Sequence, residues 1–167
     1  MTLVILEGEN KTGKTTLATK LVNDFDFKYI KCSQPKGDPY IEYQKILKKI
    51  KGNTVIDRFL YGEQVYGPLY RGKSMINDKQ LRNIEAQMKD KNAIIIYCSD
   101  SVKNIAERFD LEGEEFADKK KIGKALKLYS KVLKKSKLKI YRHVMLTKKD
   151  YLTGDGLEKI IKKYAKA

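Results

Sequence analysis

The chain of 167 residues has little of what metal centres and disulfide frameworks are built from: one histidine and two cysteines. A structural zinc site is therefore not expected, because such a site usually takes four cysteine or histidine ligands. Cys32 and Cys98 lie in apolar stretches that look like strands. Free buried thiols are the simplest interpretation, and they fit a cytoplasmic protein, in the cytoplasm of the host if the source is a virus.

Long apolar stretches are also missing. No segment approaches the roughly 20 apolar residues that cross a bilayer, and residues 1–7 lack the basic start of a signal peptide. Hydrophobic residues make up 41% and charged residues 34%, a composition typical of globular rather than disordered chains. Without a repeat or a low-complexity linker, the sequence predicts one domain over residues 1–167 and no membrane partner.

The charge is strongly unbalanced, with 36 Lys and Arg against 21 Asp and Glu and a formal net charge of +15. A partner with many phosphates would explain this excess. A genome rich in A and T would also explain it, because lysine codons then accumulate at solvated positions, and lysines occur along the chain. The composition alone leaves both explanations open.

Hydrophobic patterning alternates between expected strands and expected helices. The strands are predicted at 2–7, 27–32, 54–57, 93–98 and 139–146. The helices are predicted at 14–24, 40–50, 78–89, 102–108, 119–135 and 156–166. Residues 109–118 are acidic, contain a glycine and are expected to form a loop. Five strands with intervening helices indicate an α/β fold with an open parallel sheet.

Residues 8–15, with the sequence GENKTGKT, match the phosphate-loop pattern G-x-x-x-x-G-K-[ST] at every fixed position. Gly8 and Gly13 allow the backbone to curl, so that its N–H groups face phosphate oxygens. Lys14 is expected to reach the β- and γ-phosphates, and the Thr15 hydroxyl to bind magnesium. An apolar strand before the loop and an amphipathic helix after it complete the expected context. The sequence therefore predicts binding of ATP with Mg²⁺.

A second motif, Asp57-Arg58-Phe59, ends the third predicted strand, at the sheet edge where ligands of such folds bind. Asp57 is suited to accept a proton from an attacking oxygen or to position magnesium. Arg58 offers a planar fork for a phosphate. An exposed ion pair at a strand end is the structural alternative, and the phosphate loop on the first strand favours the functional interpretation.

With these motifs, the sequence resembles the thymidylate kinase-like branch of the P-loop nucleotide kinases. Among the members of this branch, short bacteriophage-type deoxynucleoside monophosphate kinases are most similar to residues 57–68 and to their continuation at 70–73. The matching residues comprise the loop, the second motif and the ends of two later elements: Glu7-Gly8, Lys11, Gly13-Lys14-Thr15-Thr16, Asp57-Arg58-Phe59, Ile96-Tyr97 and Glu107-Arg108.

This resemblance implies a parallel sheet of order 2-3-1-4-5, ATP–Mg²⁺ as donor, and a lid at about 109–121. It places catalysis on Lys14, Asp57, Arg58 and Lys11, and magnesium on Thr15 and Asp57. The residues expected around the donor are Gly8, Asn10, Lys11, Thr12, Gly13, Lys14, Thr15, Thr16 and Arg108. The lysines at 119–121 are either cations for the transferred phosphoryl group or a solvated helix face.

The acceptor is expected to contact Asn10, Asp57, Arg58 and Phe59. Its base is expected to lie among Gln64, Tyr66, Tyr70 and Arg71, since aromatic rings stack on bases and amide or guanidinium groups bind their edges. The alternative for Tyr66 and Tyr70 is ordinary packing under a loop. These residues predict transfer of the γ-phosphate of ATP to a deoxynucleoside monophosphate with a thymidylate-like pyrimidine.

Two departures from the family keep a second acceptor open. Asn10 stands where many thymidylate kinases carry an aspartate that contacts the sugar, and Asp100 comes one residue later than the family's carboxylate. A neutral Asn10 and the positive charge suit a bacteriophage-type kinase that phosphorylates 5-hydroxymethyluracil within DNA. A P-loop ATPase switch is a third alternative, which the acceptor motif at 57–59 disfavours. The sequence leaves the oligomeric state open, with a homodimer compatible.

Overall fold

A computed structural model describes residues 1–33, 35–111, 119–144 and 154–165. The strands are β1 (Leu3–Gly8), β2 (Lys28–Lys31), β3 (Thr54–Asp57), β4 (Ala93–Ser99) and β5 (Lys139–Val144). The helices are α1 (Lys14–Phe25), α2 (Pro39–Lys49), α3 (Leu60–Arg71), α4 (Asp78–Lys89), α5 (Val102–Leu111), α6 (Lys119–Leu133) and α7 (Gly154–Ala165).

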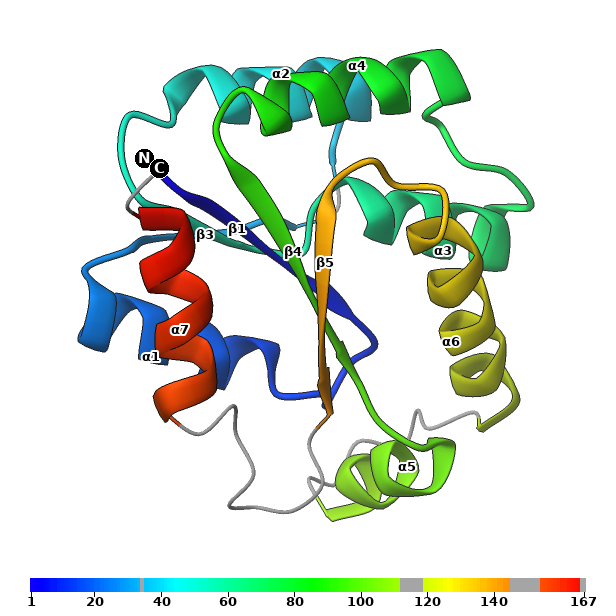
Figure 1. Cartoon of the computed structure of the whole chain (residues 1–167). Coiled ribbons are helices and arrows are strands. Elements are labelled where there is room, and N and C mark those ends of the chain that lie inside the picture. Colours follow the sequence, from blue (N-terminus) through cyan, green and yellow to red (C-terminus); the bar gives the residue numbers. More distant parts are fainter. Residues whose placement is uncertain (34, 112–118, 145–153, 166–167) are drawn as a thin grey trace.

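The five strands form one sheet in the order β2-β3-β1-β4-β5 (Figure 1). Every neighbouring pair is parallel, which confirms the predicted fold class and strand order. All residues of β1 and β4 are buried. Continuous apolar strands of this kind are expected where helices cover both faces of a parallel sheet. The carboxyl ends of all five strands therefore lie at the same edge of the sheet, and the phosphate loop follows β1 at that edge.

Alternating residues of each central strand enter different cores. In β1, Leu3 and Ile5 pack into a core that includes residues of α2, α3, α4 and α6. Val4 and Leu6 point the other way, into a core with residues of α1 and α7. Figure 1 shows α1 and α7 together on one side of the sheet, away from α3 and α6. Because successive side chains of a strand point to opposite faces of the sheet, each face has its own core and its own layer of helices.

Helix α3 was not predicted from the sequence. It contains Gly62, Gly67 and Pro68, residues that normally weaken or end a helix, and these hide its apolar pattern. Tertiary packing overrides that local preference, because the buried face of α3 joins the larger core and the helix packs against α6. The close approach at Gly67 leaves no room for a side chain: a Cβ there would lie 2.8 Å from the Lys73 carbonyl oxygen.

Several element boundaries differ from the sequence predictions. Helix α5 runs to Leu111, so the predicted loop at 109–118 begins as helix. Strand β2 is shorter than predicted, α6 ends at Leu133, and α7 begins at Gly154 rather than 156. Residues 112–118 of the predicted lid, 145–146 of the fifth strand and 166 of the last helix lie outside the described residues. Across the described ranges, no helix is both long enough and apolar enough to cross a membrane.

Gly67→Ala is expected to lower the free energy of unfolding by about 1–3 kcal/mol, because the new Cβ overlaps backbone atoms of Lys73 and Ser74. Gly123→Ala in α6 is the matched control. Its Cβ would have its nearest neighbour at 3.8 Å, so the better helix propensity of alanine should keep or raise stability by up to about 1 kcal/mol. Thermal melts followed by circular dichroism measure both variants. Similar melting temperatures for the two would contradict the packing described at Gly67.

Candidate active site

The loop at residues 8–15 joins β1 to α1 and depends on two glycines with positive φ. Gly8 has φ 143° and Gly13 has φ 82°, values that side-chain-bearing residues rarely adopt. A Cβ at Gly8 would lie 1.9 Å from the carbonyl oxygen of Cys98. Glycine at position 8 therefore lets the start of the loop pass directly beside the end of β4. Gly13 precedes the first residue of α1, so the N-terminus of this helix faces the loop.

Lys14 lies inside the loop rather than in solvent. Its Nζ donates to the carbonyl oxygen of Glu9 over 2.6 Å, and the Thr12 hydroxyl donates to the same oxygen over 2.7 Å. Burial, and to a lesser extent the nearby Arg58 guanidinium, lower the pKa of Lys14 to about 8. An anion at the loop would favour the charged ammonium form. Lys14 is thus a pre-positioned cation whose charge a phosphate would stabilise.

Asp57, at the end of β3, reaches across to the start of α1. One carboxylate oxygen accepts a hydrogen bond from the Thr15 hydroxyl over 3.1 Å and one from the Tyr29 hydroxyl over 3.2 Å. The other oxygen, Oδ1, is buried and has no hydrogen-bond partner among the residues that the structure describes. A buried carboxylate oxygen without a partner is unfavourable unless it binds a cation or a water molecule. Thr15 and Asp57 therefore fit a magnesium ion, which usually takes one or two carboxylates plus phosphate and water oxygens.

Arg58 turns from β3 toward the phosphate loop. Its backbone has φ 64°, a conformation unusual for arginine, and its N–H donates to the Leu6 carbonyl oxygen over 2.9 Å. The guanidinium donates to the Asn10 side-chain oxygen and lies 5.6 Å from the ring centroid of Tyr66. Tyr66 in turn donates through its hydroxyl to Glu9 over 2.8 Å. The structure thus brings together Asn10, Arg58 and Tyr66, three residues of the predicted acceptor site.

Two carboxylates, one directly before the loop and one within it, were not predicted as site residues. Glu7 is fully buried, and its Oε1 accepts from the backbone N–H of Phe59 over 2.9 Å and of Tyr61 over 3.2 Å. Its Oε2 accepts from the Tyr129 hydroxyl over 3.4 Å. Glu9, also buried, bonds Tyr66. A charged residue at the end of an otherwise apolar strand was the available signal for Glu7.

The carboxylate of Asp100 has a partner in this structure despite its shifted position. It forms a close ion pair with Arg108, and its other oxygen accepts from the Asn104 side chain over 2.8 Å. Arg108 also donates to the carbonyl oxygen of Lys11 in the phosphate loop over 2.8 Å. The Lys11 Nζ lies 5.6 Å from the centroid of the Phe109 ring. Helix α5 therefore contacts the tip of the loop through a guanidinium that Asp100 orients.

A cavity of about 1060 Å³ connects these groups. Its lining includes most of the predicted site residues: Asn10, Lys11, Thr12, Gly13, Lys14, Thr15, Thr16, Asp57, Arg58, Phe59, Tyr66, Tyr70, Arg71 and Arg108. Gly8 and Gln64 are not part of the lining. The Gln64 amide instead donates to the Ser74 hydroxyl over 3.1 Å and to the Ile76 carbonyl oxygen over 2.8 Å. The cavity thus joins the phosphate loop on one side to the rings of Tyr66 and Tyr70 on the other.

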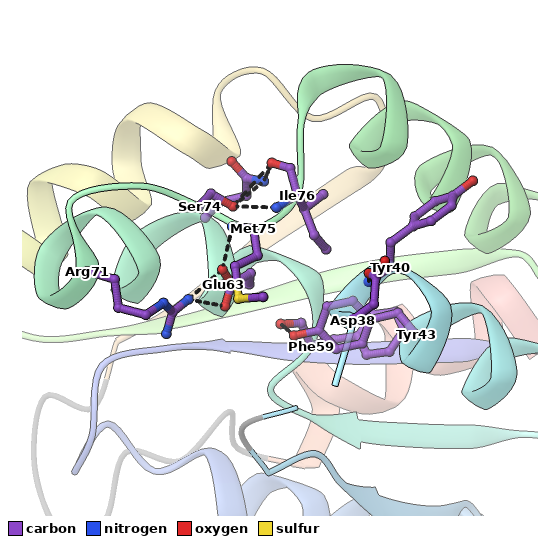
Figure 2. A network of polar contacts seen from close by, with 10 residues as sticks. Asp38, Tyr40, Tyr43, Phe59, Glu63, Arg71, Ser74, Met75 and Ile76 are labelled. Carbon is purple, nitrogen blue, oxygen red and sulfur yellow. Dashed lines mark hydrogen bonds and ion pairs between the residues drawn. The ribbon is translucent and has the colours of Figure 1, made fainter. Parts of the chain in front are cut away.

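Arg71 lines the cavity but is engaged by an unpredicted acid. Its Nη2 lies 2.6 Å from each carboxylate oxygen of Glu63, which also accepts from the Met75 N–H over 2.9 Å (Figure 2). Glu63 is buried, and its bond from Met75 connects α3 to the segment that follows, while its pair with Arg71 joins two residues of the helix itself. The sequence did not reveal this pair, because residues 63 and 71 approach each other only once the helix forms.

The fold and the loop define the class of protein: this is a P-loop kinase fold. Deoxyadenosine kinase from M. mycoides, solved with bound dCTP, superposes with a TM-score of 0.61 at 15% identity and covers 100% of both chains. Thymidylate kinase from Candida albicans gives a TM-score of 0.61 at 18% identity over 96% of this chain and 91% of its own. At such identities the likeness concerns the fold alone.

A nearer relationship identifies the family. The chain is 32% identical over 146 residues to the SPbeta prophage-derived uncharacterized protein YorR of Bacillus subtilis (strain 168), covering 84% of this chain and 87% of that protein. The crystal structure of YorR with phosphorylated GDP gives a TM-score of 0.82 at 28% identity, over 98% of this chain and 95% of that one. No known protein-family model matches the chain. The chain belongs to the same family as YorR.

Glu7 predicts a measurable dependence of stability on pH. Burial raises the pKa of Glu7 from 4.5 to about 7, although the bonds from Phe59 and Tyr61 lower it in part. The folded state then keeps a proton that the unfolded state releases. This proton stabilises the fold fully below about pH 4.5, and the contribution is lost as pH rises through about 7.

Glu7→Gln keeps the hydrogen-bond acceptor and cannot ionise. Between pH 5 and 8 the wild type should therefore lose up to about 3 kcal/mol more stability than this variant. Melting temperatures measured across that pH range give the comparison, and Glu107→Gln at an exposed position is the control that should run parallel to the wild type. Parallel curves for Glu7→Gln and the wild type would show that Glu7 does not titrate in this way.

Proposed function

We propose that this protein is an ATP-dependent phosphotransferase that moves the γ-phosphate of ATP to a deoxynucleoside monophosphate, with a thymidylate-like pyrimidine as the first candidate. One observation carries the proposal: a single cavity joins the phosphate loop, with Lys14 buried in it, to a second cation, Arg58, beside an aromatic wall. A donor triphosphate and an acceptor phosphate need such a pair of anion sites within reach of one another.

On the donor side, the loop residues 8–16 would surround the β- and γ-phosphates with backbone N–H groups and the Lys14 ammonium. Magnesium, when bound, would neutralise charge on the phosphate oxygens during transfer. The Thr15 hydroxyl and the Asp57 carboxylate are the side chains that would hold it. Arg108, oriented by Asp100, would add positive charge at the tip of the loop near Lys11.

On the acceptor side, Arg58 would bind the monophosphate and Asn10 would contact the sugar. Tyr66 and Phe59 offer apolar ring surface in the cavity, and Tyr70 lies at its exposed rim. Tyr66 and Tyr70 stack with ring centroids 6.2 Å apart and an angle of 27°, a platform suited to a planar base. Asp57 would accept the proton of an attacking phosphate or, if it binds magnesium, orient that ion. Arg71 would shape the pocket through its pair with Glu63.

The relative YorR supports a nucleotide as ligand and bears on the choice of base. Its crystal structure contains phosphorylated GDP. Guanine nucleotides therefore belong beside pyrimidine nucleotides in any substrate comparison. The sequence-based alternative, 5-hydroxymethyluracil within DNA, is supported by the net charge of +15 and by Asn10, whose neutral side chain beside Arg58 adds no negative charge to the loop.

The test of this function is phosphoryl transfer from ATP labelled at the γ-phosphate. The acceptors are dTMP, dUMP, dCMP, dAMP and dGMP, the matching deoxynucleosides, and duplex DNA with and without 5-hydroxymethyluracil. We expect the largest kcat/KM with a monophosphate. Transfer only to modified DNA would establish the alternative, and ATP hydrolysis with no acceptor product would establish an ATPase.

Lys14→Ala is expected to reduce phosphoryl transfer at least about 1000-fold, because the γ-phosphate loses its buried cation during the reaction. The change should leave the fold intact, since Lys14 makes its hydrogen bond only to the loop itself, at the Glu9 carbonyl oxygen. Transfer rates together with circular dichroism spectra measure both effects. Turnover close to that of the wild type would remove Lys14 from the mechanism.

Arg58→Ala is expected to raise the acceptor KM at least about tenfold and to change the ATP affinity much less, because Arg58 lies on the aromatic side of the cavity. Arg82→Ala, on α4, is the control for loss of one positive charge outside the cavity. Initial rates with each substrate varied in turn, and ATP binding by calorimetry, separate the two effects. An equal loss of ATP and acceptor affinity would contradict the assignment of Arg58 to the acceptor.

A further inference from the structure

Helix α6 and strand β5 carry most of the excess positive charge. Residues 119–144 contain 11 Lys and Arg and no Asp or Glu. The rest of the chain has 25 basic residues against 21 acidic ones, a net charge of only +4. A compositional bias would spread the excess positive charge evenly along the chain, and the chain does not show such an even spread. A local concentration of one charge calls for a local explanation.

Four of these lysines form one exposed row, which we call the lysine face: Lys124, Lys127, Lys131 and Lys134. Their spacing of three or four residues places them on the same side of the helix. Within the described residues, none of the four forms an ion pair, whereas Lys20 and Lys103 each pair with an acid four residues further on. Like charges at such spacing weaken a helix slightly. The row thus lowers the stability of the helix slightly, and no ion pair within the described residues offsets this cost.

The opposite side of α6 accounts for the helix itself. Ile122, Ala125, Tyr129 and Leu133 are buried. Tyr129 packs against Tyr97 and against the edge of the Tyr66 ring, at centroid distances of 5.6 and 6.0 Å. No apolar side of α6 is therefore left to enter a lipid bilayer, as an amphipathic membrane helix would require. The lysine face suits a polyanion in water.

Two stacked rings with a cation at each end lead from the start of α6 into the cavity. The Lys121 Nζ lies 5.2 Å from the ring centroid of Tyr70, which is 61% exposed. Tyr70 stacks on Tyr66, and the Arg58 guanidinium lies over the Tyr66 ring. Exposed aromatic rings next to rows of cations are the combination by which proteins bind single-stranded nucleic acid. Such rings offer stacking that a uniformly paired duplex cannot use.

The basic surface also continues past the other flank of α6. Lys134 and Arg142 line a shallow cavity of about 330 Å³ between the helix and the sheet. Arg142 is held by a hydrogen bond from its Nε to the Ser99 hydroxyl over 3.1 Å. Lys134 directly follows the last residue of α6, and its N–H still donates to the Ser130 carbonyl oxygen over 3.3 Å, so the rise from Lys124 to Lys134 is about 15 Å. One DNA strand presents about four phosphates over that length.

We infer that the lysine face binds the phosphate backbone of a single-stranded nucleic acid, with bases stacking at Tyr70 on the rim of the cavity. The binding itself does not depend on the proposed function. Only the further step, in which a nucleotide of the strand enters the cavity, rests on it.

The test is fluorescence anisotropy of a labelled 20-nucleotide single-stranded DNA with the full chain, at salt concentrations from 50 to 200 mM. The variant Lys124→Gln/Lys127→Gln/Lys131→Gln/Lys134→Gln should bind at least about tenfold more weakly at 50 mM salt. Its plot of log affinity against log salt should be less steep by about 3, the value for four lost contacts to a single strand. Its melting temperature should be equal or higher, because repulsion along the helix is relieved.

The matched control is Lys45→Gln/Lys48→Gln/Lys49→Gln/Lys51→Gln, which removes the same charge from exposed positions in and after α2. It should bind within about twofold of the wild type. Equal weakening in both variants would show that net charge alone attracts DNA, and would overturn the proposal. Tighter binding to duplex DNA or to vesicles with anionic lipid than to the single strand would overturn it as well.

Two further measurements separate this inference from the proposed function. Lys14→Ala should bind the oligonucleotide as the wild type does, although it transfers no phosphate. The quadruple α6 variant should phosphorylate a free deoxynucleoside monophosphate at the wild-type rate. Tyr70→Ala should weaken binding of the single strand more than binding of the duplex, and an equal effect on both would contradict stacking at the rim.

Discussion

The carboxylate of Glu7 holds together the two halves of the candidate active site. It lies at the end of the strand that leads into the phosphate loop, and it accepts hydrogen bonds from the N–H groups of Phe59 and Tyr61, where α3 begins. The Arg58 N–H bonds the Leu6 carbonyl oxygen next to it. These contacts fix the distance between the loop that is suited to a triphosphate and the guanidinium that is suited to a second phosphate. A buried carboxylate is costly unless it is well bonded, so its presence here indicates a constraint that packing alone does not supply.

The local part of the site was predictable, because it depends on neighbours in the sequence. The loop pattern specifies its own glycines, lysine and threonine, and the strand order then brings Asp57 beside Thr15. Helix α3 was not predictable from local preferences, since Gly62, Gly67 and Pro68 disguise it. Its glycines are explained only by tertiary neighbours, such as the chain at Lys73 and Ser74 that passes against Gly67. The Glu63–Arg71 pair and the turn of Gln64 away from the cavity follow from that helix and were hidden with it.

Long-range polar contacts show the same limit of sequence reasoning. Asp100 is displaced by one residue from the position expected of the family, and the sequence offered no partner for it. In the folded chain it lies at the start of α5, where Arg108 from the same helix reaches it and also bonds the Lys11 carbonyl oxygen. The charged residues likewise could be counted in the sequence, but only the structure shows which of them lie together on the surface. The lysines of α6 differ from those elsewhere because one row of them is exposed together and, among the described residues, forms no ion pair.

Tyr129 connects the two surfaces of the molecule that matter most. The residue belongs to α6, yet its hydroxyl bonds Glu7 and its ring contacts Tyr66 in the cavity wall. Lys127 and Lys131 stand two residues to either side of it on the solvent face. A ligand that shifts α6 would therefore act, through the buried Tyr129, on the Tyr66 ring that lines the cavity. By thermodynamic linkage, a ligand on the lysine face and a ligand in the cavity must then change each other's binding free energy by the same amount.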